Sequence, residues 1–361
     1  MRGLRKYLTP FAPDQSGAVS VLYELGGLIA ICDAGGCTGN VCGFDEPRWF
    51  EQKSALFSAG LRDMDAILGR DDRLVEKLVD AASKLDVKFV AIIGTPVPAV
   101  IGTDYKALGR MCEKRLNMPV ITIDTDGMEL YDVGEEKAWL ELFRTFAGKG
   151  MIDKASERAK PNLDIEKKQG KIGVLGLTPQ DISDLQAPKK IREYYQEKEG
   201  KEAICYGMGD GLEAVERASE VGKNIVVSAA ALEVAKYLEK TFGTPYEIGY
   251  PAAGELVPDL DYQGKKILVV HQQVMAEAIR QEILRRDSSA KVQTATWFMM
   301  KKELACPQDV SFREEDDYID LVKNGGFDII FADACMEKMV PDFRGTFVNT
   351  RHFAVSGRLC E

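Results

Sequence analysis

Long apolar runs are missing from this sequence of 361 residues. No stretch is long enough to span a bilayer, and the basic segment Met1–Lys6 is not followed by the uninterrupted apolar region of a secretory signal. We therefore expect a cytoplasmic protein with no membrane partner. In that compartment its eight cysteines stay reduced, so we expect them to be inert, catalytic or metal-bound and not to form a disulfide framework.

Blocks of basic residues and nucleotide-binding motifs are also missing. The formal net charge is −10, which argues against nucleic acid as a partner. Gly173 and Gly176 lack the third glycine of a G-x-G-x-x-G fingerprint, and the sequence contains no G-x-x-x-x-G-K-[ST] motif. We therefore expect this chain to bind no nucleotide.

The sequence does contain a repeated alternation of short apolar runs with helical stretches, which is typical of doubly wound α/β domains with mostly parallel sheets. The expected strands are 28–32, 88–93, 119–124, 171–176, 203–206, 224–228, 265–270, 291–295 and 327–331. The expected helices are 17–25, 71–79, 135–146, 211–221, 229–240 and 273–286, with a helical or mixed segment over 51–69.

The chain is too long for one ordinary core, so two or three domains are expected. Residues 148–168 are polar and mixed in charge, and they read as a linker. We predict three Rossmann-like α/β domains around a central cleft. They cover residues 1–150, 169–255 and 264–361.

Three cysteines gather in the segment 32–42, Cys-Asp-Ala-Gly-Gly-Cys-Thr-Gly-Asn-Val-Cys, which we call the cysteine segment. It follows an apolar run, so it is expected to form a loop at the carboxyl end of a strand, where open α/β sheets place ligands. Gly35 and Gly36 let a bulky ligand approach the backbone. Thiolates in such a setting are typical of iron–sulfur sites, so Cys32, Cys37 and Cys42 are candidate metal ligands.

Two alternatives stay open for these cysteines. Each can be a small apolar residue of the core, and this applies above all to Cys32 at the end of the strand. Zinc is the other candidate metal, although the C-x4-C-x4-C spacing is not that of a zinc finger or ribbon.

The two histidines, His271 and His352, lie far apart in the sequence. His271 ends a predicted strand, so it either faces the cleft as a binding residue or forms structural hydrogen bonds. Cys335 has a similar position after the strand 327–331. The remaining cysteines are expected to pack in the interior or to lie at the chain end; they are Cys112, Cys205, Cys306 and Cys360.

Several motifs resemble those of the nitrogenase component 1 superfamily. The His-Gly-Pro-x-Gly-Cys motif of that family is matched by residues 32–37, and its E-x-D-x-x-F-G-G segment by residues 63–70. Its Cys-Pro turn and Ile-Gly-Asp-Asp sequence are echoed by residues 94–96 and 101–104. The resemblance covers most of the chain in the order of its elements.

This resemblance implies a cluster ligand at Cys37. Together with the positions considered above, the candidate cofactor-binding residues are Gly35, Gly36, Thr95 and His271. Of the three cysteines that family members usually supply, this chain has only Cys37, because the other positions fall near residues 56–57 and at Thr95. We therefore expect a [4Fe–4S] cluster held between two subunits by Cys37 and Cys42 of each, with Cys32 at most auxiliary, in place of an eight-iron cluster.

The function implied by the resemblance is that of the catalytic component of a two-component reductase. A separate iron–sulfur ATPase would deliver electrons to the cluster of a homodimer, and a small-molecule substrate would lie in the cleft. The alternatives are a non-enzymatic scaffold or carrier for a cluster or metallocofactor, and an α/β protein that binds a small molecule without any metal.

Overall fold

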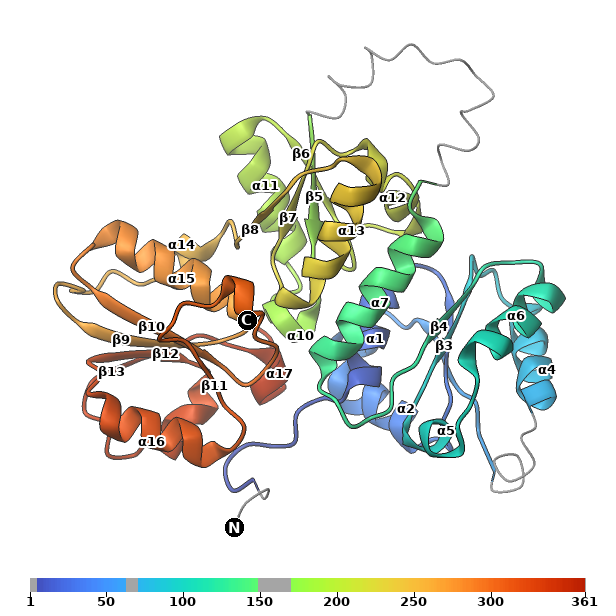
Figure 1. The fold of residues 1–361 in the computed structure, drawn as a ribbon, viewed down its shortest axis with the longest axis horizontal. Coiled ribbons are helices and arrows are strands. Elements are labelled where there is room, and N and C mark those ends of the chain that lie inside the picture. Colours follow the sequence, from blue (N-terminus) through green and yellow to red (C-terminus); the bar gives the residue numbers. More distant parts are fainter. Residues whose placement is uncertain (1–4, 63–70, 149–169, 361) are drawn as a thin grey trace.

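The computed structural model describes residues 5–62, 71–148 and 170–360, which form three parallel β-sheets flanked by helices (Figure 1). The sheets follow one another along the chain. This arrangement confirms the predicted α/β class with mostly parallel sheets. Residues 63–70, which resemble a family motif, lie outside the described residues. The same is true of residues 149–168 of the expected linker.

The first sheet has the strand order β2-β1-β3-β4. Its strands are β1 (Leu28–Ile31), β2 (Ala55–Ser58), β3 (Val90–Ile93) and β4 (Val120–Ile123). Its longer helices are α1 (Asp14–Leu22), α4 (Asp71–Ala82), α6 (Tyr105–Leu116) and α7 (Tyr131–Phe146). Alternate residues of β1 enter different cores, since Ile29 and Ile31 pack with α1 and α7 while Leu28 and Ala30 pack with α4 and α6.

The second sheet has the order β6-β5-β7-β8. Its strands are β5 (Lys171–Leu175), β6 (Glu202–Cys205), β7 (Lys223–Val226) and β8 (Tyr246–Ile248). Its helices are α10 (Pro179–Ile182), α11 (Ala187–Glu199), α12 (Leu212–Glu216) and α13 (Leu232–Phe242), with 3-10 turns at Ala218–Glu220 and Ala229–Ala231. Helix α7 joins this unit to the first, because Trp139 and Phe143 share one core with Leu175 and Val226 (Figure 1).

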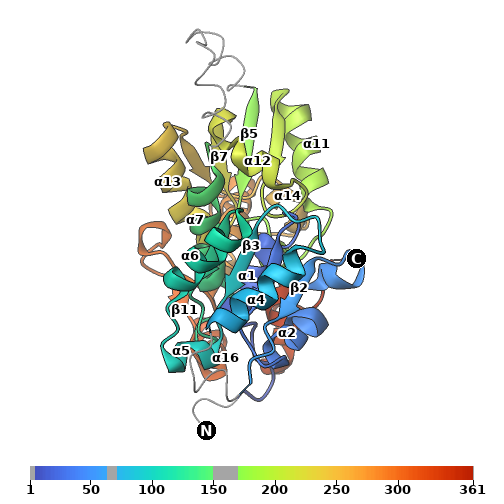
Figure 2. The same ribbon diagram turned by 90° about the vertical axis from the view of Figure 1, so that its right-hand side faces the viewer.

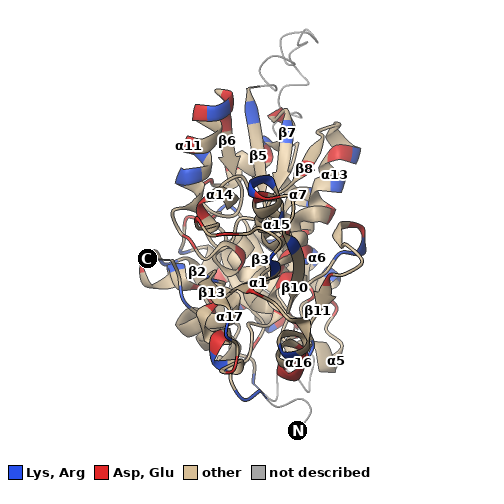
Figure 3. Cartoon of the chain, turned by 90° about the vertical axis from the view of Figure 1, so that its left-hand side faces the viewer, with Lys and Arg blue, Asp and Glu red and all other residues tan. Residues whose placement is uncertain are grey.

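The third sheet has the order β11-β10-β9-β12-β13. Its strands are β9 (Lys266–Val270), β10 (Lys291–Thr296), β11 (Val310–Ser311), β12 (Ile329–Ala332) and β13 (Thr346–Asn349). Its helices are α14 (Ala253–Leu256), α15 (Gln273–Arg286), α16 (Glu315–Gly325) and α17 (Phe353–Ser356), with 3-10 turns at Lys302–Leu304 and Ala334–Met339. Surface helices α11 and α13 carry charges of both signs (Figure 3).

The described part of the segment 51–69 contains strand β2, and the rest of that segment lies outside the described residues. One local prediction is wrong. The cysteine segment is not a loop, because residues 36–50 form successive helical turns: α2 (Gly36–Asn40), the π-helix η1 (Val41–Asp45) and the 3-10 turn η2 (Pro47–Phe50). The predicted domain limits stay a prediction, since one core extends across the first two sheets.

None of the described helices is both long enough and apolar enough to cross a membrane.

Candidate functional site

The cysteine segment begins where the parallel strands β1 and β3 end side by side. The backbone N–H of Cys32 donates to the carbonyl oxygen of Ile93 at 2.8 Å, and the Thr95 hydroxyl donates to the carbonyl oxygen of Cys32 at 2.6 Å. The structure therefore brings Cys32 and Thr95 together at the carboxyl edge of the first sheet. Helix α5 (Pro96–Ile101) follows Thr95, and Figure 2 shows α2 and α5 at the same end of this sheet.

Asp33 explains why a glycine-rich stretch becomes helical at this edge. Its carboxylate accepts from the backbone N–H of Thr38 at 2.8 Å and from the Thr38 hydroxyl at 3.0 Å. The Ser58 hydroxyl of β2 donates to the same carboxylate at 2.6 Å. Gly35 has a φ of 118°, a left-handed conformation that favours glycine, and it turns the chain into α2. Asp33 therefore caps the first turn and fixes it to the sheet.

The three cysteines occupy different environments. Cys32 is 1% exposed and packs in the core, and burial raises the pKa of its thiol to about 12. Cys37 and Cys42 are half-buried. Burial also raises the pKa of both thiols; nearby Asp33 raises it further at Cys37, whereas Lys53 opposes the rise at Cys42. Only Cys37 and Cys42 are thus accessible on the surface of the segment.

The outer surface of the cysteine segment is lined by glycine. Gly36, Gly39 and Gly43 are exposed, and a Cβ atom built on any of them would meet no atom within 4 Å. Their spacing of three and four residues places them on one helical face. Packing within the chain does not require glycine there. The face is open to an approaching backbone or ligand beside Cys37 and Cys42.

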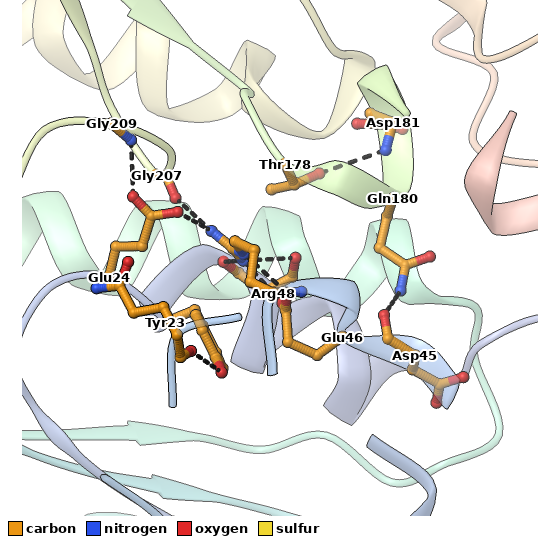
Figure 4. Close-up of polar contacts among 12 residues, drawn as sticks. Tyr23, Glu24, Asp45, Glu46, Arg48, Thr178, Gln180, Asp181, Gly207 and Gly209 are labelled. Atoms are coloured by element: carbon orange, nitrogen blue, oxygen red, sulfur yellow. Dashed lines mark hydrogen bonds and ion pairs between the residues drawn. The ribbon is translucent and has the colours of Figure 1, made fainter. Parts of the chain in front are cut away.

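Arg48 anchors the far end of these helical turns to the second unit (Figure 4). Its guanidinium contacts both carboxylate oxygens of Glu46 at 2.7 Å and that of Glu24 at 2.9 Å. It also donates to the carbonyl oxygen of Gly207 at 3.0 Å, and Gly209 donates to Glu24 at 2.8 Å. Burial opposes the charge of Arg48, but Glu46 and Glu24 outweigh it and raise its pKa. Sequence reasoning missed this buried cluster.

His271 belongs to the third sheet, and both of its ring nitrogens have partners. Its Nδ1 accepts from the backbone N–H of Gln272 at 2.9 Å, so its Nε2 carries the proton and donates to the carbonyl oxygen of Arg351 at 3.0 Å. The ring stacks on His352 at 4.1 Å. Burial lowers the pKa of His271 to about 4, so the ring is neutral. These contacts are those of a structural histidine, which is one of the two roles that the sequence left open for His271.

A second group of buried polar side chains lies where α7 meets α10. The Tyr131 hydroxyl donates to Asp181 at 2.6 Å and lies 3.4 Å from Nε2 of His352, and the Thr178 hydroxyl donates to Glu135 at 2.7 Å. Burial, reinforced by Asp181, raises the pKa of Glu135 well above its usual range. No local sequence signal indicated this cluster, because its members come from three separate parts of the chain.

Among the described residues, one group of three side chains has potential metal-ligand atoms within 4.8 Å of one another, namely Glu277, Cys306 and Asp309. Arg280 lies among them, with its guanidinium 2.6 Å from Asp309 and 3.1 Å from the sulfur of Cys306. The arginine therefore supplies the positive charge that a metal ion would bring. Within the part of one chain that the structure describes, the cysteine segment forms no such three-ligand group.

A cavity of about 700 Å³ adjoins the cysteine segment. Asn40, Gly43, Phe44 and Asp45 of that segment and of η1 form one wall. The lining is completed by Pro47 and Phe50 of η2, by Thr9, Pro10 and Ala12 of the N-terminal stretch, by Gln180 of α10, and by residues 353–357 and Leu359 around α17. Elements from all three units thus meet around a space large enough for a small molecule.

These features define a three-sheet α/β protein with two accessible cysteines and a cavity at the carboxyl edge of its first sheet. The chain belongs to the nitrogenase component 1 type oxidoreductase family, whose family model matches residues 16–252. The resemblance seen in the sequence is thereby confirmed.

The curated relatives cover only part of this chain. A nitrogenase iron-molybdenum cofactor biosynthesis protein NifE from Bradyrhizobium diazoefficiens is 24% identical over 197 residues, which is 53% of this chain and 32% of the relative. The NifE protein of a Nostoc species is 23% identical over 197 residues, which is 53% of this chain and 37% of the relative. The match therefore spans about a third of the length of these relatives.

The solved structures match over nearly the whole chain. Nitrogenase Cp1 at pH 6.5 has a TM-score of 0.70 at 14% identity, covering 97% of this chain and 87% of the other. Nitrogenase Cp1 at pH 5 has a TM-score of 0.66 at 14% identity, covering 96% and 84%. At this identity the likeness establishes the fold.

Proposed function

We propose that this protein is the catalytic component of a two-component, nitrogenase-like reductase in the cytoplasm. It accepts electrons from a separate ATP-dependent iron–sulfur protein through a cluster held by the cysteine segment. The observation that carries the proposal is the position of Cys37 and Cys42, half-buried beside a glycine face at the carboxyl edge of the first sheet. Thiolates on such a segment are suited to bind an iron–sulfur cluster.

The residues of the segment fit a [4Fe–4S] cluster only when two chains combine. Such a cluster needs four thiolates, and the cysteine segment of one chain offers two accessible ones, Cys37 and Cys42. We therefore propose a homodimer in which two cysteine segments face each other across a two-fold axis. The exposed glycines allow the two backbones to approach closely. When bound, the cluster would supply one-electron transfer.

The other candidate site residues predicted from the sequence belong to the proposal in supporting roles. Gly35 turns the chain so that α2 presents Cys37, and Gly36 keeps its surface open. The Thr95 hydroxyl donates to the carbonyl oxygen of Cys32, and this hydrogen bond fixes the first residue of the cysteine segment. His271 stays a proposed cofactor-binding residue on the third sheet, and Cys32 stays at most an auxiliary ligand.

Single replacements of cysteine by serine test the cluster site. We would reconstitute Cys37→Ser, Cys42→Ser and Cys32→Ser without oxygen and measure iron, sulfide and sedimentation. Cys360→Ser, which changes an exposed thiol near the chain end, is the matched control. We expect Cys37→Ser and Cys42→Ser to lose most of the iron, and Cys32→Ser and the control to keep it. Full iron retention by Cys37→Ser would remove the basis of the proposal.

A scaffold or carrier of a cluster or metallocofactor is the second candidate function. The names of the two curated relatives favour it, because both are described as cofactor biosynthesis proteins. Mixing the reconstituted protein with an iron–sulfur ATPase, ATP and a reductant distinguishes the two. Repeated oxidation of the reduced protein by an added small molecule supports the reductase. Loss of iron to an apo-acceptor protein without such turnover supports the carrier.

A further inference from the structure

The lining of the cavity beside the cysteine segment contains almost no ionisable side chains. Asp45 is its single ionisable lining residue, and the lining contains no lysine, arginine or histidine. Asp45 accepts from the Ser16 hydroxyl at 2.7 Å. The rest of the wall is largely apolar, with aromatic rings at Phe44, Phe50 and Phe353. A phosphate, sulfonate or carboxylate would find no cation among the lining residues and would face a carboxyl group.

Gln180 adds a specific polar feature to this wall. Its side chain is 1% exposed, and its Nε2 donates to the carbonyl oxygen of Asp45 at 2.5 Å (Figure 4). That bond fixes the orientation of the amide. Its Oε1 is buried and has no hydrogen-bond partner among the described residues. Since buried amide oxygens are normally paired, this atom is available as an acceptor for an N–H group.

We infer that the cavity binds a largely apolar small molecule, neutral or cationic, that presents an N–H donor to Gln180. Asn40 and Gly43 form part of the wall, so the bound molecule contacts the cysteine segment. Its role as the substrate rests on the proposed function, whereas the binding itself does not. Because the inferred ligand is neutral or cationic, we expect the cavity not to bind acidic substrates.

Two fluorescent probes that share one ring system test the charge selectivity. N-phenyl-1-naphthylamine is neutral and carries an N–H group, and 8-anilinonaphthalene-1-sulfonate adds a sulfonate to the same skeleton. We expect the neutral probe to bind the metal-free protein more tightly by about tenfold or more. N-methylation of the neutral probe removes the donor and should weaken its binding. Equal affinity for the neutral and anionic probes would overturn the inference.

Filling the cavity locates the probe. Gly43→Phe places a ring where a Cβ meets no atom within 4 Å, and Thr9→Trp fills the space from another part of the lining. Both should abolish binding of the neutral probe, whereas Gly254→Phe, a similar change at an exposed glycine outside the lining, should not. Undiminished binding to either folded filling variant would overturn the inference. Iron retention, measured in parallel, reports separately on the proposed cluster.

Discussion

The guanidinium of Arg48 lies 3.0 Å from the carbonyl oxygen of Gly207, a residue 159 positions further along the chain. This contact connects the helical turns that carry Cys37 and Cys42 to the second unit. Because Glu46 and Glu24 pair with the same arginine, the connection is a buried ionic cluster. The geometry of the candidate site therefore depends on a residue outside the cysteine segment.

Replacing Arg48 by methionine should strongly destabilise the protein. The change leaves Glu46, which is 1% exposed, as a buried carboxylate without its partner. The loss of a buried partner typically costs about 3–5 kcal/mol in the free energy of unfolding. Arg217→Met is the control, because its pair with Glu220 is largely exposed and should contribute less than about 1 kcal/mol. Urea unfolding measures both. Equal losses in the two variants would contradict the expected role of Arg48.

The thiols should differ in their reactivity toward iodoacetamide. In folded, metal-free protein at pH 8 we expect Cys37 and Cys42 to be alkylated, and Cys32 only after denaturation. Cys32 is buried and its thiol pKa is raised to about 12, so almost no thiolate forms. Mass spectrometry of the peptides measures the order, with exposed Cys360 as an internal reference. Rapid labelling of Cys32 in the folded state would show that this thiol is also accessible.

Much of the fold was predictable because its central strands are buried on both faces. Leu28–Ile31 and Val90–Ile93 are continuous apolar runs, and such runs mark the interior strands of parallel sheets. Helix α15 has the predicted limits, Gln273–Arg286. Of the edge strands, β4 and β6 were predicted, but others escaped prediction. Ala55–Ser58 and Thr346–Asn349 are short and partly exposed, so no apolar run indicates them.

The candidate site was predictable only in its residue types. The sequence pattern identified Cys37 and Cys42. Its three glycines favoured a loop, whereas in the structure the carboxylate of Asp33 caps the first turn of helix α2. That capping depends on the tertiary position of Ser58 as well as on local spacing. The cavity and Gln180 have no local signature, since residues of three separate units form the lining.

Replacing Glu135 by glutamine should change how stability depends on pH. Burial and Asp181 raise the pKa of Glu135 well above 4.5, so the folded state holds a proton that the unfolded state releases. This proton stabilises the wild type below pH 4.5, and the stabilisation is lost as the pH rises through the folded pKa. Glutamine stays neutral at every pH, so the Glu135→Gln variant does not lose this stability as the pH rises.

Urea unfolding of Glu135→Gln and wild type between pH 4 and 8 measures the effect. The variant should gain free energy of unfolding relative to the wild type as the pH increases above 4.5. Glu129→Gln, a change at an exposed residue, is the control and should show no such trend. A relative stability of Glu135→Gln that is constant with pH would show that Glu135 is ionised in the folded protein.

Replacing Gly39 by leucine should separate folding from assembly. Gly39 is exposed within α2, and a Cβ at this position meets no atom within 4 Å. Leucine is also a better helix former than glycine, by up to about 1 kcal/mol. The isolated chain should therefore unfold at an unchanged or slightly higher temperature.

In the proposed homodimer, however, the side chain would lie between the two facing cysteine segments. We expect the variant to sediment as a monomer and to lose iron after reconstitution, whereas Gly254→Leu on α14 keeps both dimer and iron. A Gly39→Leu protein that stays dimeric with full iron would show that the glycine face lies away from the two-fold axis.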